Sequence, residues 1–224
     1  MSPGEARRDL NADLITKTAL AVADEHGVKG FTLRAVADAL GVTPMALYHY
    51  VPDKAGLVSL VVDAALASRA LPTPTGVWQD DLWELARWTR QIMRDHPAVG
   101  KLRQTYQVWT PSVFPITERW LGIWQQSGLP LDEAVTAAVV TSLALTGIAA
   151  EEHAVGQMKL PDASMLTMLP NARLVFMVER DADADFELVA RALIEGVHAR
   201  LQADVGAAAS KPPRPGRKER ARAQ

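Results

Sequence analysis

The stretch TLRAVADALGVTPMALYHYVPDK, from Thr32 to Lys54, decides the fold of the N-terminal part of this 224-residue chain. It holds two short segments with helical apolar periodicity, joined through Gly41-Val42-Thr43. Glycine can adopt the positive φ of a tight turn, and Thr43-Pro44 is a helix cap followed by proline at the first helical position. The pattern therefore predicts a helix-turn-helix, whose second helix enters the major groove of DNA.

The outward side chains of the second helix favour contact with DNA. Hydroxyl and imidazole groups suit phosphate oxygens, whereas Met45 and Ala46 suit a thymine methyl group. Arg34 and Lys54 add cations at the starts of the flanking helices. For either Tyr48 or Tyr50 alone, a surface or packing role in a compact three-helix unit remains open. The predicted DNA-binding residues are Thr32, Arg34, Thr43, Pro44, Met45, Ala46, Tyr48, His49, Tyr50 and Lys54.

Helical periodicity continues along nearly the whole chain, and no segment alternates with the period of two that a half-buried strand shows. The sequence predicts a first helix that ends at Gly27 and a fourth helix over Ala55–Leu71, followed by a domain boundary at Pro72–Gly76. The prediction is an all-α chain with a helix-turn-helix domain over 1–71, a helical ligand-binding and dimerisation domain over 72–204, and a disordered tail over 205–224. The helices expected in the second domain are Val77–Arg94, Pro111–Gln126, Leu131–Gly156 and Asp183–Asp204, with shorter ones near Val99–Val108 and Arg173–Val178.

Composition excludes several classes of protein. The net charge of −2 removes any argument from bulk basicity toward nucleic acid, and the absence of cysteine excludes disulfides, thiolate zinc sites and a cysteine nucleophile. The start of the chain has no signal-peptide pattern, and we expect no membrane span and a cytoplasmic location. The last twenty residues carry six basic and one acidic side chain. Such a tail is either a solubilising end or a source of affinity for a polyanion.

Residues 14–66 resemble the N-terminal domain of the TetR family of bacterial transcriptional repressors. The match runs over ITKTALAVADEHGVKGFTLRAVADALGVTPMALYHYVPDKAGL, with the turn ALGV and the signature LYHYV followed by an acidic residue and lysine. The resemblance implies a homodimer that binds a near-palindromic operator in double-stranded DNA. It also implies that a small molecule bound in the C-terminal body lowers the affinity for the operator.

Part of the body, Trp120–Ala154, is similar to tetracycline repressors. Gly147 and Glu151 match a glycine and a glutamate there, and the resemblance implies that this glutamate reaches toward the magnesium-tetracycline of the partner subunit. The stretch Ala98–Leu102 has no histidine where the tetracycline-type members carry a metal ligand. This departure argues against tetracycline as effector, and we expect neither a metal nor a cofactor.

Two further features of the body point to partners. The small residues of Leu131–Gly156 and the apolar residues of Asp183–Asp204 suit a four-helix interface between two copies, unless both helices lie in the core of a monomer. An aromatic-walled cavity would take a largely apolar effector, although aromatic residues at helical spacing also suit a plain core, the role expected for Trp78, Trp83 and Trp88. The predicted effector-binding residues are Met93, Tyr106, Trp109, Trp120, Trp124 and Glu151, with Phe114 and His153 as neighbours.

An enzyme is not expected. The acidic groups lack the repeated Glu/His pattern of a di-iron bundle and the spacing of a calcium loop. The sequence has no phosphate-binding glycine loop, GxSxG or HExxH motif. The remaining alternative is a helix-turn-helix protein that binds DNA without sensing a small molecule.

Overall fold

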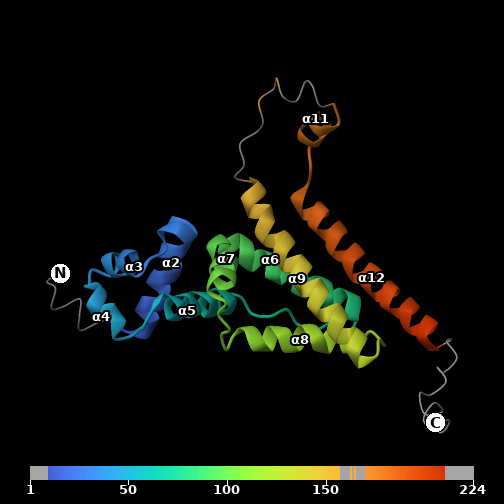
Figure 1. Ribbon diagram of the computed structural model, residues 1–224, viewed down its shortest axis with the longest axis horizontal. Coiled ribbons are helices and arrows are strands. Elements are labelled where there is room, and N and C mark those ends of the chain that lie inside the picture. Colours follow the sequence, from blue (N-terminus) through green and yellow to red (C-terminus); the bar gives the residue numbers. More distant parts are fainter. Residues whose placement is uncertain (1–9, 157–161, 163, 165–169, 210–224) are drawn as a thin grey trace, which may run out of the picture.

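The computed structural model describes residues 10–156, 162, 164 and 170–209, and Figure 1 shows its two-part arrangement. The described residues form helices and no strand, which confirms the all-α prediction. The N-terminal domain holds α2 (Ala12–Gly30), α3 (Leu33–Ala39), α4 (Pro44–Tyr48) and α5 (Lys54–Ala67). The body holds α6 (Trp78–Asp95), α7 (Pro97–Tyr106), α8 (Val113–Gln125), α9 (Leu131–Gly156), α11 (Pro170–Met177) and α12 (Ala182–Ala209).

Local capping explains where the helices of the N-terminal domain begin. The Oδ1 atom of Asn11 accepts a hydrogen bond from the backbone N–H of Leu14 at 2.9 Å, and Asp53 caps α5 in the same way through Gly56 at 2.8 Å. Gly27 has a φ of +63° and interrupts the first helix where the sequence predicted its end, after which helical turns resume as far as Gly30.

The body is built around the long helix α9, which packs against α6 and α8 and has α12 alongside it (Figure 1). Several boundaries differ from those expected, and α5 ends at Ala67 rather than Leu71. The helix predicted near Val99–Val108 begins at Pro97, and α12 continues to Ala209, five residues into the segment predicted as a disordered tail. The rest of that tail, 210–224, lies outside the described residues.

Helix α7 joins the two domains, because it packs against both α2 and α5 (Figure 1). The imidazole Nδ1 of His96, just before α7, lies 2.9 Å from Oδ2 of Asp24 in α2. The backbone N–H of Ser112 donates to Asp63 in α5 at 3.1 Å. Buried apolar residues of both domains form one continuous core, so the domains contact each other through packed side chains as well as the linker.

The sequence analysis expects no membrane span, yet one helix among the described residues is long and apolar enough for one. Helix α9 passes that test over Leu131–Glu152, because it is uncharged from Ala134 to Ala150. One side of this helix packs against α6 and α8, as the core helix of a globular protein does. Length and composition alone are therefore weak evidence that α9 enters a membrane.

Candidate nucleic-acid interface and ligand cleft

Two threonine caps and one glycine set the geometry of the helix-turn-helix. Thr32 Oγ1 accepts from the N–H of Ala35 at 3.0 Å, and Thr43 Oγ1 accepts from the N–H of Ala46 at 3.3 Å. Between the two helices, Gly41 has a φ of +66°, a conformation that other residues rarely adopt. Leu47 is fully buried and anchors α4 on the domain core. The predicted turn is therefore formed by the residues that the sequence indicated.

The outer face of α4 is exposed as predicted. Met45 has an exposed fraction of 69%, and Thr43, Pro44, Tyr48, His49 and Tyr50 are also exposed, whereas Ala46 is half-buried. Nothing within the described residues covers this row of hydroxyl, imidazole and thioether groups. The face has the size and composition of an element that reads a DNA groove.

Besides the two capping threonines, three of the predicted DNA-binding residues have side-chain contacts inside the protein. The hydroxyl of Tyr50 donates to the carbonyl of Leu10 at 2.8 Å. The ammonium of Lys54 lies 5.9 Å from the ring centre of Phe31 and 5.3 Å from that of Tyr106, so it bridges the N-terminal domain and α7. Arg34 is nearly fully exposed and has only a long, 3.8 Å ion pair with Asp38. Arg34 is therefore the cation most available to phosphate.

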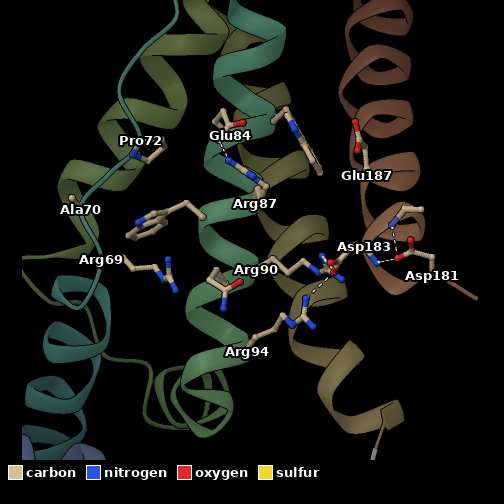
Figure 2. A pocket seen from close by; sticks show the side chains of 14 residues that line it. Arg69, Ala70, Pro72, Glu84, Arg87, Arg90, Arg94, Asp181, Asp183 and Glu187 are labelled. Atoms are coloured by element: carbon tan, nitrogen blue, oxygen red, sulfur yellow. Dashed lines mark hydrogen bonds and ion pairs between the residues drawn. The ribbon is translucent and has the colours of Figure 1, made fainter.

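The body contains a cleft of about 710 Å³ between the segment after α5, helix α6 and the start of α12. Arg69 reaches it from the segment after α5, and Arg87, Arg90 and Arg94 reach it from α6 (Figure 2). None of the six predicted effector-binding residues lines this cleft. Its lining residues are Arg69, Ala70, Pro72, Trp83, Glu84, Arg87, Trp88, Arg90, Gln91, Arg94, Asp181, Asp183, Ala184 and Glu187.

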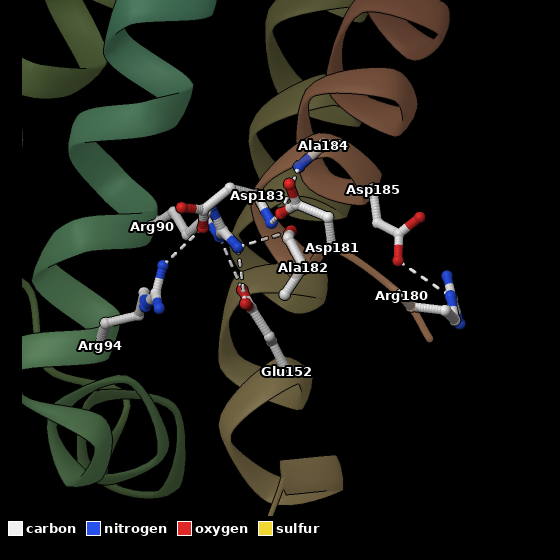
Figure 3. A network of polar contacts seen from close by, with 9 residues as sticks. All are labelled: Arg90, Arg94, Glu152, Arg180, Asp181, Ala182, Asp183, Ala184 and Asp185. Atoms are coloured by element: carbon white, nitrogen blue, oxygen red, sulfur yellow. Dashed lines mark hydrogen bonds and ion pairs between the residues drawn. The ribbon is translucent and has the colours of Figure 1, made fainter. Parts of the chain in front are cut away.

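An ion-pair network around the buried side chain of Arg90 forms one end of the cleft (Figure 3). The guanidinium of Arg90 pairs in bidentate fashion with Glu152, at 2.7 and 2.6 Å, and also donates to Asp183 at 2.8 Å. The hydrogen bonds to Glu152 raise the pKa of Arg90, which burial alone would lower. Hydrogen bonds from Arg94 and Arg90 lower the pKa of the Asp183 carboxyl. The network thus fixes α6 against the end of α9 and the start of α12.

The structure separates the residues of the predicted effector site. Trp120 and Trp124 do come together, but in the core, where both indole N–H groups donate to Thr141 Oγ1 at 3.1 Å. Trp109 is 66% exposed and lies beside Phe114, 6.2 Å between ring centres.

The other predicted effector-binding residues have different neighbours again. Tyr106 contacts Lys54, and Met93 lies against Gly100. Glu151 is exposed, and the adjacent Glu152 is the residue that pairs with Arg90. The side chain of His153 is outside the described residues. The structure therefore does not gather the six residues into one cavity.

Two of the tryptophans expected in the core also line the cleft, Trp88 as a buried core residue and Trp83 packed against that core. Trp83 is half-buried and Trp88 is 8% exposed. The signal available in the sequence was the spacing of Arg87, Arg90 and Arg94, which places three guanidinium groups on one side of a helix that also carries these indoles. Within the described residues, no group of three or more His, Cys, Asp or Glu side chains could hold a metal ion.

Comparison with known proteins places this architecture in one family. The family model "Bacterial regulatory proteins, tetR family" matches residues 15–61, and "Tetracyclin repressor-like, C-terminal domain" matches residues 71–201. The chain belongs to the TetR family of transcriptional regulators. The predicted resemblance is thereby confirmed, and regulators of this family bind DNA through the helix-turn-helix domain.

Individual relatives agree with this assignment. The HTH-type transcriptional repressor DrrR1 of Streptomyces coeruleorubidus is 31% identical over 142 residues, which cover 62% of this chain and 53% of the repressor. This chain thus aligns with about half the length of that relative. The tetracycline repressor protein class E of Escherichia coli is 29% identical over 67% of this chain and 72% of its own.

Solved structures share the fold. Apo ActR from Streptomyces coelicolor has a TM-score of 0.69 at 24% identity, with 91% of this chain and 99% of that chain covered. BioQ, solved with its double-stranded DNA operator, has a TM-score of 0.66 at 21% identity and covers 85% of this chain and 99% of its own.

Proposed function

We propose that this TetR-family regulator is a cytoplasmic repressor that binds a palindromic operator as a homodimer and releases it when a small molecule binds the body. The observation that carries the proposal is the uncovered face of α4, with Met45, Tyr48 and His49 exposed on a capped helix-turn-helix. The BioQ structure, which contains an operator, supports DNA as the ligand of such a fold.

An apolar face on two adjacent helices supports the homodimer. On α9, Leu143 is 70% exposed and Val139 is 51% exposed, and on α12 Leu188 is 71% exposed. A groove of about 350 Å³ between α9 and α12 is lined mainly by apolar side chains, including Leu193 and Val197. Contiguous apolar surface of this kind marks an interaction site. A second copy covers it with the same surface in a twofold arrangement, which also presents two α4 helices to the half-sites of a palindrome.

The cleft and the relatives support a small-molecule effector. The structure of ActR with actinorhodin and the structure of a TetR variant of Acinetobacter baumannii with minocycline show small molecules in related folds. The volume of about 710 Å³ falls within the usual range for small-molecule sites. Trp83 and Trp88 offer apolar ring surface to such a molecule.

Substitution of Arg34 tests the DNA-binding role. After operator selection from random duplexes, Arg34→Gln is expected to weaken binding to all sequences alike and to lower the salt dependence of log K by about one unit per lost phosphate contact. Fluorescence anisotropy at several salt concentrations measures both the affinity for each duplex and the salt dependence of log K. The matched control is Arg180→Gln, because Arg180 also forms an exposed ion pair, with Asp185, but lies just before α12 and outside the N-terminal domain. Equal behaviour of the two variants would contradict the proposed interface.

A further inference from the structure

The cleft between the segment after α5, α6 and α12 combines two kinds of recognition group. Three of its guanidinium groups have N–H donors that form no hydrogen bond among the described residues. Within the described residues, Arg69 donates only through Nε, to Asp95 at 3.1 Å. Arg87 donates only through Nη2, to Glu84, and Arg94 only through Nη1, to Asp183. A guanidinium carries five N–H donors in a planar fork that matches a carboxylate.

The carboxylates of the cleft are already engaged. Asp181 accepts hydrogen bonds from the N–H groups of Asp183 and Ala184 at the start of α12, and Glu187 pairs with Arg191 at 2.8 Å. Asp183 is shared by two arginines. Each of these carboxylates accepts through one oxygen, whereas Arg69, Arg87 and Arg94 each donate through a single nitrogen and keep the larger share of unused groups, which favours an anionic ligand.

The second kind of group is aromatic. Trp83 and Trp88 both line the cleft. The indole Nε1 of Trp88 is buried and has no hydrogen-bond acceptor among the described residues. Buried donors are nearly always paired in native proteins, so this unpaired N–H beside the cleft is an exception. Of the two indoles, the half-buried Trp83 offers ring surface to another ring, whereas Trp88 is only 8% exposed.

We propose that this cleft binds an aromatic acid, a flat ring system whose carboxylate pairs with Arg69 and Arg87 while its ring lies against the indoles of Trp83 and Trp88. The inference deepens the proposed function, because it names the chemical class of the effector and assigns its site. The cleft touches both the segment that leaves the N-terminal domain and the start of α12. A ligand here contacts the connection to the DNA-binding domain and the helix that carries part of the proposed dimer face.

Isothermal titration calorimetry of the full chain tests the proposal with 2-naphthoate as probe. The neutral 2-naphthamide has the same ring without the charge, and inorganic phosphate has charge without a ring. We expect 2-naphthoate to bind more tightly than either. The double variant Arg69→Gln/Arg87→Gln is expected to bind 2-naphthoate about tenfold more weakly and 2-naphthamide unchanged, since two half-exposed charged hydrogen-bond partners are lost.

Arg180→Gln is the matched control. Its side chain is 61% exposed and that of Arg87 is 60%, and both form an ion pair, but Arg180 points away from the cleft toward Asp185 (Figure 3). Unchanged 2-naphthoate binding in this variant excludes a general charge effect. The proposal is overturned if 2-naphthoate does not bind, if the amide or phosphate binds equally well, or if the double variant matches the wild type. Operator binding by the same protein, measured by anisotropy, is independent of these outcomes and reports on the proposed function alone.

Discussion

Replacing Thr141 by valine tests whether the two tryptophans of α8 belong to the core or to a ligand cavity. The hydroxyl oxygen of Thr141 accepts from Trp120 Nε1 and Trp124 Nε1, both at 3.1 Å, and its own hydrogen goes to the carbonyl of Ala137 at 2.6 Å. Valine has nearly the same shape but accepts no hydrogen bond. Each buried N–H left without a partner costs about 1–3 kcal/mol, so Thr141→Val is expected to lower the free energy of unfolding by roughly 2–6 kcal/mol.

Urea unfolding followed by tryptophan fluorescence measures this loss, at one fixed protein concentration because the proposed dimerisation would contribute to stability. Thr117→Val is the matched control. The hydroxyl of Thr117 also donates to a carbonyl of its own helix, that of Val113, at 3.1 Å. Its side chain is exposed, however, and accepts no hydrogen bond from an indole among the described residues. The control is expected to change the free energy of unfolding by no more than about 0.5 kcal/mol.

A double-mutant cycle with Trp120→Phe sharpens the test. Once Trp120 has lost its N–H, Thr141→Val leaves only one donor unpaired instead of two, so the two changes are expected to be non-additive by about 1–2 kcal/mol. Operator binding well below the unfolding transition is expected to stay unchanged. The reasoning fails if Thr141→Val loses no more stability than the control, or if the cycle is additive.

Three further substitutions test the network, the linker and the dimer face. Arg90→Met leaves Glu152 without its partner and is expected to lower the free energy of unfolding by about 3–5 kcal/mol in urea. Burial raises the pKa of the Asp81 carboxyl, but hydrogen bonds from Thr75 and Gly76 outweigh this and lower it. Asp81 thus stabilises the fold above its unfolded pKa of about 3.9 and loses this effect as pH falls through its lower folded pKa. Asp81→Asn should therefore destabilise the protein at pH 7 but much less near pH 3, as urea midpoints at both pH values would show. Leu143→Glu is expected to give monomers in sedimentation, and an intact dimer would exclude this face.

Much of the N-terminal domain was predictable because its signals are local. Asn11, Thr32, Thr43 and Asp53 each cap a helix through an N–H three residues later, and this geometry depends on no distant contact. The turn glycine Gly41 acts within the same short range. Exposure of the outer face of α4 followed from the same periodicity, since Leu47 alone anchors that helix in the core.

The cleft beside α6 could not be predicted in this way, because it joins distant segments. Arg90 and Asp183 are 93 positions apart, and their contact depends on how α12 packs beside α6. That Glu152 pairs with Arg90 could not be read from the sequence for a related reason. Successive residues of a helix point about 100° apart, and α9 is apolar around most of its circumference, so its sequence does not show which glutamate faces α6.

Three consecutive side chains at the end of α6 connect the parts of the molecule that a ligand would have to couple. Arg94 pairs with Asp183 at the start of α12, Asp95 with Arg69 just beyond α5, and His96 with Asp24 in α2. Arg69 and Arg94 also line the cleft, so an anion that attracts their guanidinium groups acts on two of the three contacts directly.

Such a ligand changes operator affinity only if its own affinity differs between the arrangements of the domains. A coupling of about 1–3 kcal/mol, roughly five- to 150-fold in affinity, is usual for allosteric proteins. It is comparable to the strength of one or two partly buried ion pairs. Rearrangement at the end of α6 is therefore sufficient in magnitude to link the cleft to the DNA-binding domain, without any unfolding of the body.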